Sequence, residues 1–206
     1  MRDVPLAILA LTIWAYWLGV AAMVIRVRKK TRTLAGAVPE DRLERRMWIV
    51  WVPVIIAWIV LPILAMQRTH WLLTLPAIAQ EQPLFQLRAA ACAVAVICFV
   101  LTTRVWRRMG KDWRMAVRVD RQSTLITDNL FHYVRHPIYS LSILLMLASV
   151  IVVPTLPMLA TGILHVTLMV LKAKNEERYL LAAYGDRYAA YAAGTGRFFP
   201  RLSRRD

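Results

Sequence analysis

Long, continuous apolar stretches dominate this sequence and limit the folds open to it. A helix of about 20 apolar residues spans the hydrocarbon core of a bilayer. A soluble domain holds about 45–50% apolar residues, whereas this chain has 59% hydrophobic residues and gathers them in runs. We therefore predict an all-α, polytopic integral membrane protein with about five transmembrane helices. The predicted spans are Leu6–Ile25, Met47–Met66, Ala89–Thr103, Ile138–Val153 and Met158–Leu171.

Basic residues are concentrated in three of the segments outside these spans. Eight Lys or Arg residues lie in each of the segments 26–46, 104–135 and 172–205. Five spans place all three segments on one side, and the positive-inside rule makes that side cytoplasmic. We expect a bacterial inner membrane protein with its N-terminus outside and its C-terminus inside. The net charge of +15 then indicates contact with membrane lipids and not with nucleic acid.

Flanking residues predict how two of the apolar runs behave. The basic cluster Arg26–Arg32 follows the first run. This pattern is typical of a stop-transfer segment, so we expect a retained span and not a cleaved signal peptide. Residues 154–157 read Pro-Thr-Leu-Pro, which predicts a tight turn between the fourth and fifth runs. The last two spans should therefore form a helical hairpin, followed by a cytoplasmic, tyrosine-rich C-terminal helix.

Of the Asp, Glu, Lys, Arg and His residues in the chain, only His165 lies inside a predicted span. An intramembrane ionisable group is a marker of function, but a histidine here could also simply hydrogen-bond to a neighbouring helix. Cys92 and Cys98 lie six positions apart in one apolar run, so they do not share a helix face. No spacing in the chain indicates a metal site, and the chemistry is expected mainly at the cytoplasmic edge.

A first polar cluster, residues 128–139, directly precedes the fourth span. Pro137 suits the first turn of a helix, where its missing N–H costs nothing. Arg135 and His136 then lie at the helix mouth, where free N–H groups and the helix dipole favour an anion. The alternative is that these residues only anchor the helix at the membrane interface.

A second polar cluster, residues 172–191, follows the fifth span and includes the acidic pair Glu176 and Glu177. If the helix continues through Tyr184, the two acids lie on adjoining faces. They could form ordinary surface salt bridges with Arg178 or Lys174. Alternatively, they could hold the ammonium group of a ligand.

Together these clusters resemble the isoprenylcysteine carboxyl methyltransferases and the related phospholipid methyltransferases. The shared pattern is R-H-P-x-Y, a helical hairpin, an E-E pair and a tyrosine-rich tail ending in R-F-x-P. In this chain these elements are Arg135–Tyr139, Glu176–Glu177, Tyr184–Tyr191 and Arg197–Pro200. The resemblance covers residues 109–202.

The resemblance implies a membrane methyltransferase that uses S-adenosylmethionine in a cytoplasm-facing pocket. It implies a single membrane domain, 1–206, with N-terminal spans in 1–103 and a cofactor-binding catalytic core in 104–206. It implies that Glu177 binds the ammonium group of the cofactor. The residues that it makes catalytic are Arg135, His136 and Glu176. Those that it places against the cofactor are Tyr133, His136, Pro137, Tyr139, Glu177, Tyr188 and Arg197.

The predicted reaction is methyl transfer to a lipophilic substrate at the membrane. The acceptor group is a carboxylate, a thiol, a phenol or an amine. A carboxylate needs no base, whereas the other three must lose a proton, which His136 or a glutamate would accept. No nucleic-acid partner and no metal is expected. One alternative is an NADPH-dependent enzyme that resembles sterol reductases, although their motif is similar to R-H-x-N-Y and lacks the E-E pair. The other is a non-catalytic membrane protein on the same scaffold.

Overall fold

The fold is built from helices throughout the residues described by the computed structural model, which are 3–32, 41–67, 70–110, 113–115 and 125–201. This confirms the prediction of an all-α, polytopic membrane protein. The elements are α1 (Val4–Thr31), α2 (Arg42–Gln67), the 3₁₀ helix η1 (Ala77–Gln80), α3 (Leu84–Met109), α4 (Leu130–Tyr133), α5 (Pro137–Val152), α6 (Leu156–Tyr184) and α7 (Asp186–Gly194).

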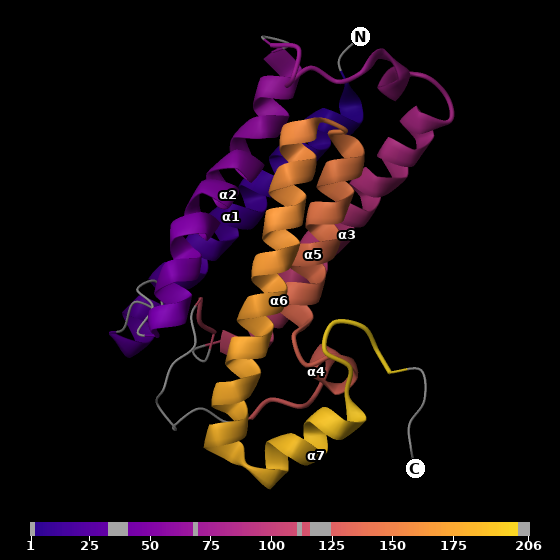
Figure 1. The fold of residues 1–206 in the computed structure, drawn as a ribbon. Coiled ribbons are helices and arrows are strands. Elements are labelled where there is room, and N and C mark those ends of the chain that lie inside the picture. Colours follow the sequence, from indigo (N-terminus) through magenta and orange to yellow (C-terminus); the bar gives the residue numbers. More distant parts are fainter. Residues whose placement is uncertain (1–2, 33–40, 68–69, 111–112, 116–124, 202–206) are drawn as a thin grey trace.

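Five helices run side by side as a bundle (Figure 1). Four of them, α1, α2, α3 and α6, are long and apolar enough to cross a membrane. The fifth, α5, has 16 residues, about 24 Å at 1.5 Å per residue. It is shorter than the bilayer core and packs against α3 and α6. As predicted, α5 and α6 form a hairpin, with Thr155 capping the start of α6.

The outer surface of the bundle is apolar, as contact with lipid requires. Large side chains that point outward include Leu11 on α1, Ile49 on α2 and Ile163 on α6, which are 70%, 74% and 60% exposed. In water, exposed apolar area on this scale would be unfavourable and prone to association. In a bilayer the same side chains contact lipid at no such cost.

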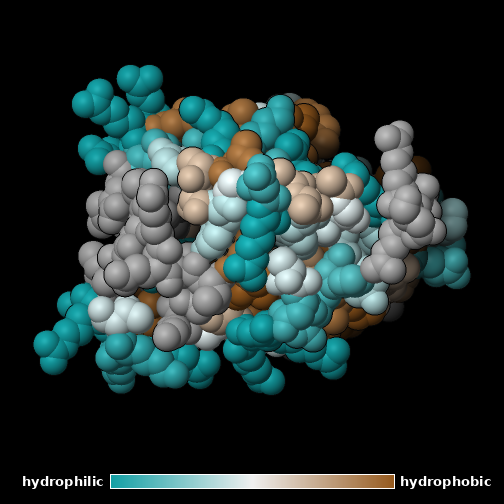
Figure 2. All heavy atoms as spheres, turned by 90° about the horizontal axis from the view of Figure 1, so that it is seen from below, coloured by the Kyte–Doolittle hydropathy of each residue, from teal (hydrophilic) through white to brown (hydrophobic). Residues whose placement is uncertain are grey.

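The two ends of the bundle differ in charge. Figure 1 shows the C-terminal ends of α1 and α3, the start of α2, and α4 and α7 gathered at one end, which we call the α7 end. The described parts of the three basic segments lie there, as the charge count predicts. Seen from this end, many hydrophilic side chains are at the surface, with hydrophobic ones visible between and behind them (Figure 2).

Close packing inside the bundle is achieved with small residues and tryptophans. A Cβ on Gly162 of α6 would lie 2.7 Å from Cγ2 of Val150, so glycine permits the near approach of α5 and α6. Trp58 of α2 is fully buried, and its indole N–H donates to Oγ of Ser149 at 2.9 Å.

The end opposite α7 is fastened by a buried ion pair. Arg88 of α3 is 0% exposed, and its Nη2 lies 2.6 Å from Oδ2 of Asp3. The same guanidinium donates to the carbonyls of Val152 at 2.9 Å and Ala79 at 3.0 Å. Asp3 also accepts from the N–H of Leu6. One side chain therefore joins the start of α1, η1, α3 and the α5–α6 turn.

Candidate functional site

A cavity of about 760 Å³, counting its open mouth, lies between the helices on the α7 side. One wall carries polar side chains and the other is aromatic. The polar lining residues are Arg114, Arg135, His136, Tyr139, Ser142, Lys172 and Glu176. The aromatic lining residues on the other wall are Tyr16, Trp17, Trp51, Trp106, Trp113 and Phe131.

The R-H-P stretch is positioned by the start of α5 and by the C-terminal segment. Pro137 is the first residue of α5, as predicted, and His136 precedes it as the N-cap. The backbone N–H of Arg135 donates to the carbonyl of Gly196 at 2.8 Å, and that of His136 to the carbonyl of Arg197 at 3.2 Å. A Cβ on Gly196 would lie 1.7 Å from the carbonyl oxygen of Phe199, so only glycine fits at this crossing.

Glu177 is the centre of an ion-pair cluster behind the cavity wall. It lies beyond Leu171, where the apolar part of α6 ends. Its Oε1 accepts from Nε of Arg135 at 2.9 Å, and Arg197 binds both carboxylate oxygens, at 3.0 and 2.5 Å. Burial raises the pKa of Glu177, but hydrogen bonds from His136, Arg197 and Arg135 outweigh it and hold the pKa well below its usual range. The carboxylate is therefore charged and already paired.

His136 lies between the two acids of the E-E pair. Its Nε2 is 3.2 Å from Oε1 of Glu177, and its Nδ1 is 3.5 Å from Oε2 of Glu176. Burial lowers the pKa of His136, but the contacts with Glu176 and Glu177 more than compensate, so the pKa is raised. Both ring nitrogens thus face acceptors, which is the arrangement of a protonated imidazolium.

Glu176 is the acid that lines the cavity. Its side chain is 32% exposed, against 15% for Glu177. The ring of His136 stacks on that of Tyr139, with centroids 5.3 Å apart and an interplanar angle of 8°. Glu176, His136 and Tyr139 therefore form one face that a ligand in the cavity can touch.

The predicted site residues divide into two groups in the structure. Arg135, His136, Pro137, Tyr139 and Glu176 line the cavity.

The remaining predicted residues do not line the cavity. Glu177 and Arg197 form the ion-pair cluster behind the wall. Tyr188 is buried at 3% exposure. Tyr133 is 59% exposed, with its ring edge-on to His132.

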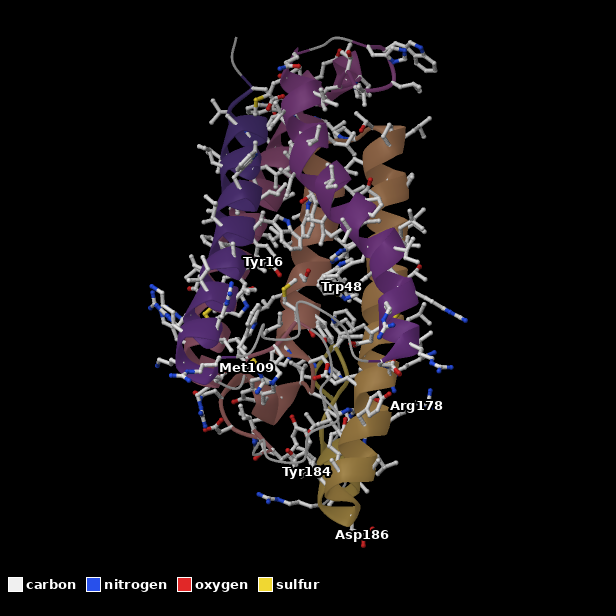
Figure 3. All side chains as sticks on the ribbon, turned by 90° about the vertical axis from the view of Figure 1, so that its left-hand side faces the viewer. Tyr16, Trp48, Met109, Arg178, Tyr184 and Asp186 are labelled. Atoms are coloured by element: carbon white, nitrogen blue, oxygen red, sulfur yellow. The ribbon has the colours of Figure 1, made fainter. Side chains whose placement is uncertain are left out.

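Sequence reasoning missed the aromatic wall, which comes largely from the N-terminal spans. Figure 3 shows Tyr16 inside the helical bundle, far from Asp186 at the tip of the α7 end. A signal was present, because Tyr16 and Trp17 lie mid-way along an uncharged run, whereas membrane aromatics favour the interfaces. Lys172 was counted as a tail residue, but it is 5% exposed and its Nζ lies 5.0 Å from the centre of the Trp51 ring.

The intramembrane histidine is hydrogen-bonded, as one of the two predicted alternatives requires. Nε2 of His165 lies 3.0 Å from Oγ of Ser142 on α5. The imidazole is 1% exposed. His165 does not line the cavity, but Ser142 does.

Comparison with known proteins agrees with the resemblance described above. The family model described as phospholipid methyltransferase matches residues 87–187. No curated protein gives a significant match to the chain. The matched segment contains most of α3, the R-H-P-x-Y stretch, the α5–α6 hairpin and the E-E pair. All of these except α3 supply polar residues to the cavity lining. Through this segment, which is just under half of the chain, the protein is similar to the phospholipid methyltransferase family.

Proposed function

We propose that the protein transfers the methyl group of S-adenosylmethionine to a lipophilic acceptor at the membrane. The observation that carries the proposal is the meeting of the two family motifs. His136 lies between Glu176 and Glu177, which are about 40 positions further along the chain. His136 also lines a cavity that has aromatic residues in its lining. The match to the family model suggests the reaction class, and the cavity provides a place for donor and acceptor to meet.

The charges of the cavity suit this cofactor. S-adenosylmethionine carries a sulfonium and an ammonium cation and one carboxylate. Glu176 is an accessible acid for a cation, and aromatic faces attract cations as well. Lys172 and Arg135 are cations on the same lining and suit a carboxylate. When bound, the cofactor supplies an activated methyl group, so the protein's task is to orient the acceptor and exclude water.

The site residues take two kinds of role in this proposal. Arg135, His136, Pro137, Tyr139 and Glu176 face the ligands. Because Glu177 is already paired with two arginines, we assign contact with the cofactor's cationic groups to Glu176 first.

Glu177 and Arg197 then hold the wall in shape. Tyr188 supports the same wall, since Glu177 lies close enough to contribute to the raised pKa of the buried Tyr188. Tyr133 is the predicted cofactor contact with the least support, because its side chain is exposed and is not among the residues that line the cavity.

We further propose that the cavity opens to the cytoplasm of a bacterial inner membrane, with the N-terminus outside. The gathering of basic segments at the α7 end supports this orientation. Within one membrane domain, residues 104–206 form the cofactor-binding core, and residues 1–103 contribute Tyr16, Trp17 and Trp51 to the aromatic lining for the acceptor. The polar cofactor enters from the α7 end, and the apolar acceptor reaches the cavity from the lipid side.

The test is ligand binding to purified protein in detergent, using S-adenosylhomocysteine and NADPH in parallel titrations. Binding of S-adenosylhomocysteine alone is expected. Binding of NADPH alone would support a reductase, and binding of neither would support a non-catalytic scaffold. Glu176→Gln should weaken S-adenosylhomocysteine by about ten- to a hundredfold, the loss of one charge-assisted hydrogen bond. Unchanged affinity in this variant would remove Glu176 from the cofactor site.

A further inference from the structure

Lys172 is a charged residue in a place where charge is costly. It is 5% exposed and directly follows Leu171, where the apolar part of α6 ends. A buried ammonium group is unfavourable unless it is paired or hydrogen-bonded, and lysine is among the residues least often buried. Lys172 also lines the cavity. An ionisable side chain buried in a membrane bundle is by default a candidate for a ligand contact.

Helix α2 supplies the surroundings of the Lys172 ammonium group. Oε1 of Glu44, a residue of α2 that is 0% exposed, lies 4.0 Å from Nζ of Lys172. The centre of the Trp51 ring lies 5.0 Å from the same Nζ. Burial disfavours the charge of the ammonium, whereas a carboxylate and an aromatic face favour it. Glu44 and Trp51 both lie outside residues 87–187, the segment that matches the family model.

The ammonium group of Lys172 has capacity for a further acceptor. An ammonium carries three N–H donors. In the described contacts, one of them goes to the carbonyl of Met115. Glu44, at 4.0 Å, is farther away than a hydrogen bond allows. Lys172 can therefore donate to an anion in the cavity while it keeps its hydrogen bond to Met115.

Lys172 and Glu176 together present the two charges that an amino acid group requires. They are four positions apart on α6, so they lie on the same face of the helix with Cβ atoms about 5–6 Å apart. Both line the cavity. Their partners in the protein differ, because Glu176 faces His136 and Lys172 faces Glu44. An α-amino acid group carries its ammonium and carboxylate on one carbon, and it fits between an anion and a cation spaced in this way.

We propose that Lys172 binds the carboxylate of S-adenosylmethionine, while Glu176 binds its ammonium group. This inference rests on the proposed function. Arg135, the other cation considered for the carboxylate, is already engaged. Its Nε lies 2.9 Å from Oε1 of Glu177, and its Nη1 donates to two carbonyls of the C-terminal segment. Through Lys172, α2 takes part in cofactor binding although it lies outside the matched segment.

The experiment measures binding to purified full-length protein in detergent, with no methyl acceptor present. The first probe is S-adenosylhomocysteine. The second is its decarboxylated analogue, S-adenosyl-3-thiopropylamine, and the third is 5′-methylthioadenosine, which lacks both charged groups. Because no acceptor is present, any effect that depends on a carboxylate belongs to the cofactor and not to an acidic acceptor.

Three variants are compared with the wild type. Lys172→Met keeps the length of the side chain and removes its charge. Arg114→Met removes another cation of the cavity lining. The matched control is Lys174→Met, because Lys174 is an exposed lysine of the same helix that is not among the residues lining the cavity.

The wild type should prefer S-adenosylhomocysteine to its decarboxylated analogue by about ten- to a hundredfold, the value of one charge-assisted hydrogen bond. Lys172→Met should abolish this preference by weakening S-adenosylhomocysteine alone, since the other two probes have no carboxylate to lose. Lys174→Met and Arg114→Met should keep the wild-type preference. Equal weakening of all three probes by Lys172→Met would reduce Lys172 to a structural residue and overturn the inference. Loss of the preference in Arg114→Met and not in Lys172→Met would also overturn it.

A double variant covers the case in which Lys172→Met does not fold. The single change removes the cation beside the buried Glu44 carboxylate, which is expected to lower stability. Glu44→Gln combined with Lys172→Met removes both charges, and it should show the same loss of preference. A double variant that discriminates as the wild type does would overturn the assignment of Lys172. A wild type that does not bind S-adenosylhomocysteine would instead contradict the proposed function itself.

Discussion

The two ends of the bundle each contain arginines paired with carboxylates, yet the two clusters are built for different tasks. At the far end, Arg88 is completely buried, and each of its hydrogen bonds joins two parts of the chain. At the α7 end, Arg135 and Arg197 hold Glu177 beside an open cavity, and Glu176 remains partly exposed. In the first cluster the guanidinium is fully enclosed by its partners. The second leaves one acid and one histidine ring at a cavity wall.

The comparison indicates how a buried structural ion pair can be distinguished from a ligand-binding site. In the Arg88 cluster the guanidinium and the Asp3 carboxylate both have partners within the protein. Removal of this cluster should therefore affect folding alone. In the α7 cluster the buried ion pairs position His136 and Glu176, which also line the cavity, so removal of the cluster should affect ligands more than folding. Substitutions at the two ends test this contrast directly.

The largest effect is expected from Asp3→Leu. This change leaves the Arg88 guanidinium buried without its carboxylate, which typically costs about 3–5 kcal/mol. The melting temperature in detergent should fall steeply, while S-adenosylhomocysteine affinity of the folded fraction stays unchanged. The double variant Asp3→Leu with Arg88→Met should recover part of the loss, because no unpaired charge remains. A single variant as stable as the wild type would show that the Arg88 cluster does not fasten this end.

Glu177→Gln should act mainly through the shape of the cavity wall. The substitution leaves Arg135 and Arg197 without their shared carboxylate, and glutamine cannot replace the bidentate contact with Arg197. We expect faster hydrogen exchange in residues 195–201 and weaker S-adenosylhomocysteine binding, by about ten- to a hundredfold. Weaker binding with unchanged exchange would instead mean that Glu177 touches the cofactor itself, as the family resemblance implies.

Arg135→Lys should reduce methyl transfer while leaving insertion and folding intact. Arg135 donates to Glu177 and also to the carbonyls of Ala192 and Thr195, and lysine lacks the planar fork that makes these contacts together. The matched control is Arg108→Lys, because Arg108 pairs with Asp128 in an exposed position where ion pairs contribute about 0–1 kcal/mol. Equal activity of the two variants would reduce Arg135 to a membrane anchor.

The smallest expected effect is a pH dependence of stability at His136. Its pKa in the folded protein is raised by Glu176 and Glu177 in spite of burial, so it exceeds the unfolded value of about 6.5. The stabilisation from the imidazolium is therefore complete below about pH 6.5 and is lost as the pH rises through the folded pKa. Melting temperatures of the wild type and His136→Gln should differ most at mildly acidic pH. A gap that widens toward alkaline pH would contradict the charged state assigned to His136.

The sequence predicted those parts of the molecule that depend on local patterns. Apolar runs indicated the bundle, and Pro137 marked the start of α5. The Pro-Thr-Leu-Pro turn at 154–157 gave the hairpin. Continuation of the helix through Tyr184 was considered only as a condition for the placement of the two acids, and α6 does end at that residue. Each of these depends on residues that are close together in the chain.

Features that depend on distant pairings could not be read in the same way. Nothing local shows that Glu177 is saturated by Arg135 and Arg197 while Glu176 faces the cavity, because the two acids are adjacent and chemically identical. The aromatic wall was missed for a similar reason. A tryptophan such as Trp51 reads as ordinary span lining until the packing of α2 against α1 and α6 turns it toward the polar motif.

The contact between the R-H-P stretch and the C-terminal segment has a consequence for biosynthesis. Arg135 and Thr195, which this contact joins, are 60 positions apart in the chain. At about 5–20 residues per second, the ribosome needs about 3–12 s to add that many residues. During this interval α1, α2, α3 and α5 can already insert. The R-H-P stretch then still lacks Glu176, Glu177 and the C-terminal segment that it contacts. A nascent chain therefore lacks the contacts of Arg135 and His136 with residues 195–197 until those residues have been made.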